Sequence, residues 1–355
     1  MAKTLYFVST TPQSGKSAIC LALALVLRDD GLDVSYMKPL GASLMRFGDD
    51  YVDEDAYVAY GALGIDAPWE CGSPVLLTDD LKAAPLAGPV EGLEAKIKQA
   101  LACISSGRDL VMMEGLGRIF DGQALGLQPT RIAELTDAAV IPIIAYRPDL
   151  DLDSILFTRQ LFGERLLGVV VNGAPPRMVE KTASQLEPFM QQNGLRLLGV
   201  LYRDPILRSV TVRELAEELG GKVLCGEDNL DELVETFSLG AMTGDAAFRF
   251  FQSKANKAVI TGGDRSDVIM AALRTSTRCL ILTGNLRPNV RVLGEAAHRG
   301  VPMMLVRDDT LSTTERVERA IGHVRLSSSR QLARLKETKS DYRHIADVIK
   351  EALEL

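Results

Sequence analysis

The sequence lacks the features that would suit it to nucleic acid or to a membrane. It has 355 residues, with 40 Lys and Arg against 47 Asp and Glu, and its formal net charge is −7. No excess of cations is therefore available to neutralise a nucleic-acid backbone. Apolar runs such as residues 138–145 are far shorter than the roughly 20 residues that cross a bilayer. We expect no nucleic-acid partner and no membrane span.

Metal-binding and disulfide patterns are also missing. The five cysteines include no C-x-x-C pair, and the three histidines do not have the spacing of zinc ligands. An odd number of cysteines without a framework indicates reduced thiols in a cytoplasmic protein. The N-terminus runs directly into a short apolar strand, unlike a signal peptide. The residues concerned are Cys20, Cys71, Cys103, Cys225, Cys279, His298, His323 and His344.

What is present is a long alternation of short apolar runs with helical patterns. Such runs, separated by helices, predict a doubly wound parallel α/β sheet that is covered on both faces. A second, smaller βα series follows residue 204, and residues 331–355 are charged and helical. The length also favours two domains. We predict strands at 5–8, 34–37, 110–113, 140–145, 167–171 and 197–201, and then at 258–260, 279–282 and 303–306. The predicted parts are 1–204, 205–325 and 326–355.

A phosphate-binding loop follows the first predicted strand. Residues 10–17 read TTPQSGKS and fit G-x-x-x-x-G-K-[ST], except that Thr10 replaces the first Gly. Backbone N–H groups and the helix dipole of such a loop point at an anion. Lys16 would pair with the β- and γ-phosphates, and the Ser17 hydroxyl would bind Mg²⁺. We predict bound ATP with Mg²⁺; the alternative is an accidental turn that caps the helix at Ser14. The predicted nucleotide contacts are Thr10, Thr11, Gln13, Ser14, Gly15, Lys16, Ser17, Ala18 and Asn172.

Polar side chains also follow other predicted strands, where the ligand crevice of a doubly wound sheet lies. Glu114 could hold Mg²⁺ directly or through water, or it could be a solvated carboxylate. Lys38 lies in the same crevice or is an ordinary surface lysine. The Asn172 amide could read the adenine edge, because it offers both a donor and an acceptor. The acidic run 49–55, taken alone, is typical of a solvated helix start.

Together these residues resemble one family. Residues 1 to about 202 resemble dethiobiotin synthetase and the ATP-dependent cobyrinic acid a,c-diamide synthases, whose loop has the form G-T-x-T-x-x-G-K-[ST] and carries a Thr at the position of Thr10. The other matching positions are Lys38-Pro39, Asp55-Ala56, Glu114 to Gly117 and Asn172. The resemblance implies that Lys16, Lys38 and Glu114 are catalytic. It implies that Ser17, Asp55 and Glu114 bind Mg²⁺.

The second half resembles the DRTGG domain, which is usually regulatory. Asp264 and Arg265 keep its Asp-Arg pair, whereas Asn285, after Thr283 and Gly284, stands where a second Gly is expected. These positions could bind a small anionic effector. Equally, Asp264 and Arg265 could form a mutual ion pair that fixes the turn. The expected second-domain ligand site is Asp264, Arg265, Thr283 and Asn285.

An ATPase domain followed by a DRTGG domain resembles the N-terminal region of long bacterial phosphate acetyltransferases. The resemblance covers about residues 1–320 and leaves out the acetyltransferase domain, so we expect no acetyltransferase activity. Two functions stay open. One is an ATP-binding regulatory protein with slow or no hydrolysis, and the other is an ATP-dependent carbon–nitrogen ligase for an unidentified carboxylate. Against the ligase, residues 40–42 lack the Ser-rich loop of the synthetases. Both kinds of domain tend to form dimers, so we expect a homodimer.

Overall fold

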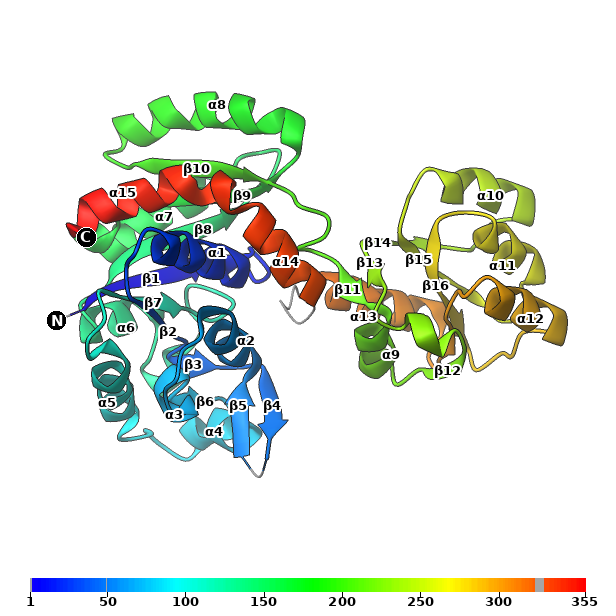
Figure 1. Ribbon diagram of the computed structural model, residues 1–355, viewed down its shortest axis with the longest axis horizontal. Coiled ribbons are helices and arrows are strands. Elements are labelled where there is room, and N and C mark those ends of the chain that lie inside the picture. The colour runs from blue at the N-terminus through cyan, green and yellow to red at the C-terminus, as the bar shows by residue number, and fades with distance from the viewer. Residues whose placement is uncertain (1, 49, 323–328) are drawn as a thin grey trace. The chain divides into compact units, whose positions relative to one another are not determined.

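A computed structural model describes residues 2–48, 50–322 and 329–355 of the chain (Figure 1). These residues divide into two compact units, one comprising Met1–Arg203 with Leu332–Leu355 and the other Asp204–Gln331. The predicted boundary between residues 325 and 326, as well as Asp49 and His323, lies outside the described residues. From Leu332 onward, the C-terminal segment belongs to the first unit rather than standing apart as a tail.

The first unit is built on a sheet of six parallel strands, so the predicted doubly wound parallel sheet is confirmed. Strands β2 (Val34–Met37) and β7 (Leu110–Glu114) are buried at every position, as expected for strands covered on both faces. In sheet order the strands are β10 (Leu197–Tyr202), β9 (Val169–Ala174), β8 (Ala139–Ala145), β1 (Lys3–Ser9), β7 (Leu110–Glu114) and β2 (Val34–Met37).

Helices cover both faces of this sheet (Figure 1). On one face lies α1 (Lys16–Asp29), which is buried at every position from 18 to 27. On the other, α5 (Leu93–Ser105) and α6 (Pro129–Leu135) share a core with β1 and β7. A further core joins β8 and β9 to α7 (Leu152–Phe162) and α8 (Val179–Gln192). The long apolar face of α1 fixes the helix that begins at the phosphate loop.

The C-terminal segment packs on α1. The 3₁₀ turn Lys339–Tyr342 and helix α15 (Arg343–Leu353) both contact it. Asp30, at the end of α1, pairs with Arg343 and, at 2.6 Å, with Lys350, while Asp29 pairs with Lys339. Acidic groups are unfavourable at a helix C-terminus, so these cations compensate the charge there.

Several short elements lie between β2 and α5, and of these only a helix start at the acidic run was expected, although its N-cap Asp53 is buried rather than solvated. They are β3 (Leu40–Gly41), β4 (Leu44–Phe47), β5 (Asp50–Asp53), α2 (Glu54–Leu63), α3 (Trp69–Gly72), β6 (Val75–Leu76) and α4 (Asp79–Ala83). Strands β4 and β5 form a hairpin that leads directly into α2. This segment carries Lys38 at one end and Asp53 and Asp55 farther along, so its path decides whether these side chains meet.

The prediction that all five cysteines are reduced is wrong for one pair. Cys71 of α3 and Cys103 of α5 form a disulfide across a 6.2 Å Cα–Cα separation. The two residues are 32 positions apart, and they meet because α3 packs on α5. The spacing of the cysteines in the sequence does not predict that α3 and α5 pack together. Cys20, Cys225 and Cys279 are free.

The second unit is a smaller α/β domain, as predicted, and its sheet has five strands. Its strand order is β12 (Lys222–Cys225), β17 (Met303–Leu305), β16 (Thr277–Thr283), β15 (Lys257–Gly262) and β14 (Thr236–Leu239). Only β12 among them runs antiparallel to its neighbour. Strands β15, β16 and β17 match the three predicted runs. The two cores of the unit contain α10 (Gly244–Gln252), α11 (Ser266–Leu273) and α12 (Val290–His298) in one, and α9 (Val212–Leu219) and α13 (Thr310–Gly322) in the other.

No helix within the described residues is both long enough and apolar enough to cross a membrane.

Candidate functional site

The phosphate loop connects β1 to α1 and contains buried hydroxyl groups without partners. The Oγ atoms of Thr10, Thr11 and Ser14 are buried, and none has a hydrogen-bond partner among the described residues. Gly15 has φ of 87°, a conformation that favours glycine. It is the N-cap of α1, without a side-chain cap bond. The alternative in which Ser14 caps the helix is thus not seen. Because buried hydroxyls without partners are unfavourable, the loop fits an oxygen-rich ligand.

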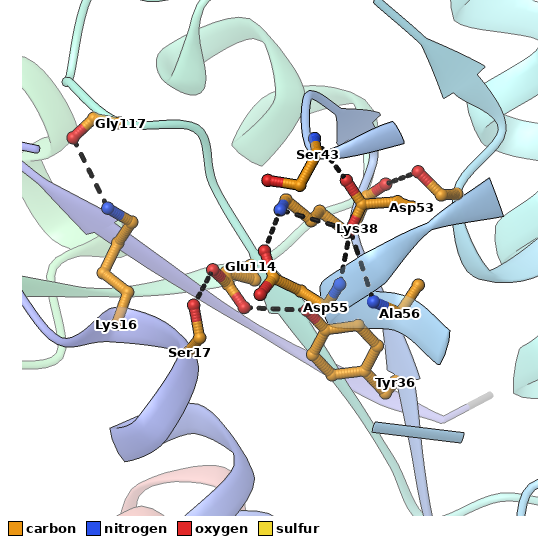
Figure 2. Close-up of polar contacts among 11 residues, drawn as sticks. Lys16, Ser17, Tyr36, Lys38, Ser43, Asp53, Asp55, Ala56, Glu114 and Gly117 are labelled. Carbon is orange, nitrogen blue, oxygen red and sulfur yellow. Dashed lines mark hydrogen bonds and ion pairs between the residues drawn. The ribbon is translucent and has the colours of Figure 1, made fainter. Parts of the chain in front are cut away.

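Lys16 lies at the start of α1 with its ammonium group close to neutral oxygens. Its Nζ donates to Oγ of Ser9 at 2.7 Å and to the carbonyl oxygen of Gly117 at 3.4 Å. Figure 2 shows the side chain directed at Gly117, away from Ser17. The residue is 6% exposed, and this burial lowers the pKa of Lys16 to about 8. Since both partners are neutral, the positive charge is left for an anion.

Glu114, the last residue of β7, lies beside the first turn of α1. Its Oε1 accepts a 2.6 Å hydrogen bond from Ser17, and its Oε2 accepts a 2.7 Å bond from the hydroxyl of Tyr36 (Figure 2). Burial, and secondly the charge of Asp55, raise the pKa of Glu114 to about 7. Glu114 is 3% exposed, so it is not a solvated strand-end carboxylate.

The pair of Ser17 and Glu114 provides the hard oxygen donors that Mg²⁺ prefers. Among the described residues, no group of three or more His, Cys, Asp or Glu side chains is arranged to hold a metal. Mg²⁺ usually retains waters and binds through one or two carboxylates together with substrate phosphates. The residues present therefore fit a metal ion that arrives with the nucleotide. The assignment of Ser17, Asp55 and Glu114 as its ligands stays a prediction.

Lys38 forms the centre of a buried ion cluster beside Glu114. It follows β2 and is 5% exposed, so it is not an ordinary surface lysine. Its Nζ pairs with Oδ2 of Asp55 and lies 3.2 Å from Oδ1 of Asp53. Burial acts to lower the pKa of Lys38, but the charges of Asp55, Glu114 and Asp53 outweigh it and raise the pKa. Lys38 is therefore charged and has acidic partners.

Asn172 of β9 contacts the phosphate loop itself. Its Nδ2 donates a 2.7 Å hydrogen bond to the carbonyl oxygen of Ser14. The amide also lies against Gly15, where an added Cβ would come within 2.3 Å of Nδ2. The amide N–H is thus used to hold the loop. Contact between Asn172 and adenine stays a prediction.

The four predicted residues of the second unit lie at the ends of adjacent strands. Asp264 and Arg265 follow β15, and Thr283 and Asn285 lie at the end of β16. Arg265 donates to the carbonyl oxygen of Met242 at 2.6 Å and pairs with Asp267 at 3.2 Å. The hydroxyls of Thr283 and Thr310 are 2.8 Å apart. Asp264 and Asn285 are exposed.

These contacts bear on both alternatives for Asp264 and Arg265. The ion pair that Arg265 makes within the described part of the chain is with Asp267 rather than with Asp264. Arg265 and Thr283 are engaged inside the unit. The groups available to a ligand there are therefore the exposed carboxylate of Asp264 and the exposed amide of Asn285.

Comparison with known families agrees with this geometry. The model of an AAA domain matches residues 3–211, and that of a DRTGG domain matches residues 214–320. The chain belongs to the AAA domain family. Its P-loop domain is followed by a DRTGG domain, as the sequence motifs indicate.

The relatives agree with the resemblance found in the sequence. The chain is 25% identical over 356 residues to the phosphate acetyltransferase of Nitratidesulfovibrio vulgaris, an alignment that covers 94% of this chain and 49% of the relative. With the phosphate acetyltransferase of Pseudomonas putida it shares 27% identity over 337 residues, 89% of this chain and 47% of the relative. It thus spans about half the length of these curated relatives.

A shorter relative matches the AAA domain alone. The chain is 24% identical over 201 residues to the ATP-dependent dethiobiotin synthetase of Aromatoleum aromaticum, covering 55% of this chain and 88% of that protein. The resemblance is therefore confirmed for both parts of the chain: an AAA domain similar to dethiobiotin synthetase is followed by a DRTGG domain, and the chain as a whole is similar to phosphate acetyltransferases.

Two residues of this site were missed by the sequence analysis. Tyr36 lies two positions before Lys38, so strand alternation places both on the same side of the sheet. Asp53 lies two positions before Asp55, at the N-cap of α2, where its side chain accepts from the backbone of Asp55 and Ala56. An N-cap rule applied to the acidic run would have singled out Asp53.

Proposed function

We propose that this chain is an ATP- and Mg²⁺-binding regulatory protein with slow or no intrinsic hydrolysis, related to the N-terminal region of the phosphate acetyltransferases. One observation carries the nucleotide part of the proposal. In the part of the chain that the structure describes, three buried hydroxyls of the phosphate loop have no partner, and the hydrogen bonds of Lys16 beside them go to neutral oxygens. A polyphosphate supplies both the acceptors that these hydroxyls lack and the negative charge that Lys16 lacks.

Each residue of the site has a role in this proposal. Lys16 and the N–H groups of residues 10–18 bind the phosphates, and Asn172 holds the loop at Ser14. Ser17 and Glu114, with Asp55 beside them, would hold Mg²⁺, which neutralises phosphate charge when bound. These residues favour binding of the nucleotide, because they can position its phosphates and neutralise the phosphate charge without any side chain that reacts covalently.

The charge state of Lys38 supports regulation over ligation. A ligase that phosphorylates a carboxylate needs a cation to receive that substrate. Lys38, whose charge acts on Glu114, is already paired with two carboxylates, those of Asp53 and Asp55. The dethiobiotin synthetase relative favours the rival function, an ATP-dependent carbon–nitrogen ligase. A regulatory protein and a ligase would use the same crevice, so a measurement of ATP turnover has to distinguish the two functions.

The DRTGG domain supports a regulatory role in a second way. Exposed Asp264 and Asn285 follow adjacent parallel strands, and ligands of open parallel sheets bind at that edge. We place a small-molecule effector there, with nucleotide occupancy in the AAA domain relayed to the DRTGG domain. A cytoplasmic homodimer is part of the proposal. Dimerisation is checked by light scattering with and without ATP.

Calorimetric titration with ATP tests the nucleotide site. Lys16→Ala should abolish detectable binding, because the phosphates lose their cation. Lys82→Ala, which removes a lysine that is 56% exposed in the same unit, should bind as the wild type does. Full affinity in Lys16→Ala would refute the site.

Turnover distinguishes regulator from ligase. ADP release should be slow and unchanged when small carboxylates and amines are added together. Strong stimulation of ADP release by a carboxylate and an amine together would establish the ligase and refute the regulatory function.

A further inference from the structure

Asp53 connects the parts of the nucleotide site that come from different segments. It is fully buried. Its Oδ1 accepts from the backbone N–H groups of Asp55 at 3.0 Å and Ala56 at 3.3 Å, and its Oδ2 accepts from the N–H of Ser43 at 3.1 Å. Lys38 Nζ lies 3.2 Å from Oδ1 (Figure 2). One carboxylate therefore joins the end of β2, the start of β4 and the first turn of α2.

The surrounding backbone leaves room for this arrangement. At Gly41 an added Cβ would lie 2.9 Å from Cβ of Asp53 and 2.5 Å from Oγ of Ser73. Ser73 in turn donates to the carbonyl oxygen of Lys38 at 3.0 Å. A side chain at residue 41 would therefore displace Asp53, which pairs with the ammonium group of Lys38, and Ser73, which bonds its carbonyl oxygen.

The two acidic partners of Lys38 are held very differently. Asp53 is fixed by three backbone N–H groups besides Lys38. The carboxylate of Asp55 has Lys38 as its hydrogen-bond partner and is 16% exposed, against 0% for Asp53. Asp55 can therefore turn away from Lys38 with the loss of one contact, whereas Asp53 cannot move without uncapping α2.

We propose that Asp53 is a positioning residue of the nucleotide site: it retains Lys38 in the crevice when the carboxylate of Asp55 turns to the Mg²⁺ of the bound nucleotide. The inference rests on the proposed function, since it assumes that Mg²⁺ and ATP bind together. Asp55 is the exchangeable partner of Lys38, and Asp53 is the permanent one.

The physical reason is the energy of a buried charge. A buried ammonium that loses its counter-ion is strongly disfavoured. If Asp53 were neutral, the release of Asp55 would leave Lys38 without either of the carboxylates that pair with it, and only the charge of Glu114 nearby would remain. Asp55 would then remain bound to Lys38 and would be withheld from the metal. Removing the charge of Asp53 should weaken the gain in ATP affinity that Mg²⁺ gives, and leave metal-free binding almost unchanged.

The test is a calorimetric titration of Asp53→Asn with ATP, in Mg²⁺ and in EDTA. Asn caps helices about as well as Asp, so α2 should keep its start. We expect an affinity for ATP in EDTA within about twofold of the wild type, and an affinity for Mg²⁺-ATP about tenfold lower, the size of one charge-assisted hydrogen bond. Asp50→Asn, an exposed acid of the same hairpin, is the matched control and should leave both affinities unchanged.

A double-mutant cycle tests whether Asp53 acts through Lys38. In the Lys38→Met background, Asp55 has no ion pair to break before it can turn to the metal. Asp53→Asn should therefore no longer affect the gain in ATP affinity that Mg²⁺ gives. The melting temperature of each variant reports whether it folds. If Asp53→Asn does not fold, Asp53→Ser, which keeps a capping oxygen without the charge, takes its place.

The outcomes separate the inference from the proposed function. An equal loss of affinity with and without Mg²⁺, or an unchanged effect in the Lys38→Met background, overturns the positioning role alone. A wild-type chain that binds no ATP in either buffer overturns the proposed function, and the inference falls with it.

Discussion

The hydroxyl of Tyr36 donates a 2.7 Å hydrogen bond to Oε2 of Glu114, and both groups are buried. The other carboxylate oxygen, Oε1, accepts from Ser17 at 2.6 Å. Both oxygens of Glu114 are thus held by hydroxyl donors from neighbouring elements, one on β2 and one on α1. The acid is fixed in direction before any ligand binds, so Tyr36 orients Glu114 toward the first turn of α1.

Tyr36→Phe should therefore weaken nucleotide binding in Mg²⁺. The change removes one hydrogen bond and keeps the ring, leaving Oε2 of Glu114 without this donor. We expect the affinity for Mg²⁺-ATP to fall about three- to tenfold, as for one net hydrogen bond. Calorimetry measures it. Tyr51→Phe, where the residue is 58% exposed, is the control and should have no effect. Equal affinities for the two variants would contradict the orienting role.

Asn172 provides a second prediction, because its amide bonds the phosphate loop at Ser14. If the side chain acts by holding the loop, Asn172→Ala should reduce ATP and GTP affinities by the same factor, about fivefold for one lost hydrogen bond. If it reads the base, the ratio of the two affinities should change instead. Parallel titrations with both nucleotides decide between them. Asn193→Ala, at the end of α8, serves as the control.

The sheet of the first unit was predictable because its strands are mostly apolar and helical patterns separate them. The residues 34–37 and 110–113 form strands as predicted, and Glu114 extends β7 by one residue. The phosphate loop was predictable because its chemistry is local in sequence. Ser17, Lys16 and Gly15 lie within three positions, and a strand and a helix flank them.

The ion cluster around Lys38 was only partly predictable. The resemblance identified Lys38 and Asp55, but not that they pair with each other. That contact depends on the β4–β5 hairpin and on α2, which are short elements without a strong period. Polar and aromatic residues alternate irregularly in this segment, so its sequence pattern does not predict a strand. Likewise, the contact between α3 and α5 that joins Cys71 to Cys103 is set by tertiary packing.

Gly263, in the turn after β15, allows a very close approach of two loops. An added Cβ would lie 1.7 Å from the carbonyl oxygen of Leu286, which belongs to the loop after β16. Gly263→Ala should destabilise the second unit by about 2–4 kcal/mol, because the backbone itself has to move. The same substitution at Gly294 of α12 meets no atom within 4 Å. It should be neutral or stabilise the helix by up to about 1 kcal/mol.

Denaturation followed by two probes measures this difference. The single tryptophan, Trp69, lies in the first unit, so its fluorescence reports on that unit. Circular dichroism reports on the helices of both. Gly263→Ala should shift the unfolding of the second unit to lower denaturant. That shift should appear in the circular dichroism curve but not in the fluorescence curve. Identical curves for the two alanine variants would show that the loops can separate freely.

Lys257 is a buried ammonium without an acidic partner among the described residues. It is 0% exposed, and its Nζ donates to the carbonyl oxygens of Lys254 and Ser276, at 3.1 and 3.0 Å, and to Oγ1 of Thr275 at 2.9 Å. Burial, and secondly the charge of Lys254, lower the pKa of Lys257 to about 8. In the unfolded chain a lysine has a pKa of about 10.4.

The sign of the resulting pH dependence follows from proton counting. Between pH 8 and pH 10 the unfolded chain holds the proton on Lys257 more strongly than the folded chain does. Stability therefore rises with pH across this range. Relative to Lys257→Met, the free energy of unfolding of the second unit should increase by about 1–2 kcal/mol from pH 8 to pH 10. Lys222→Met, an exposed lysine of β12, is the control and should run parallel to the wild type. A difference between wild type and Lys257→Met that stays constant with pH would mean that Lys257 titrates as it does in water.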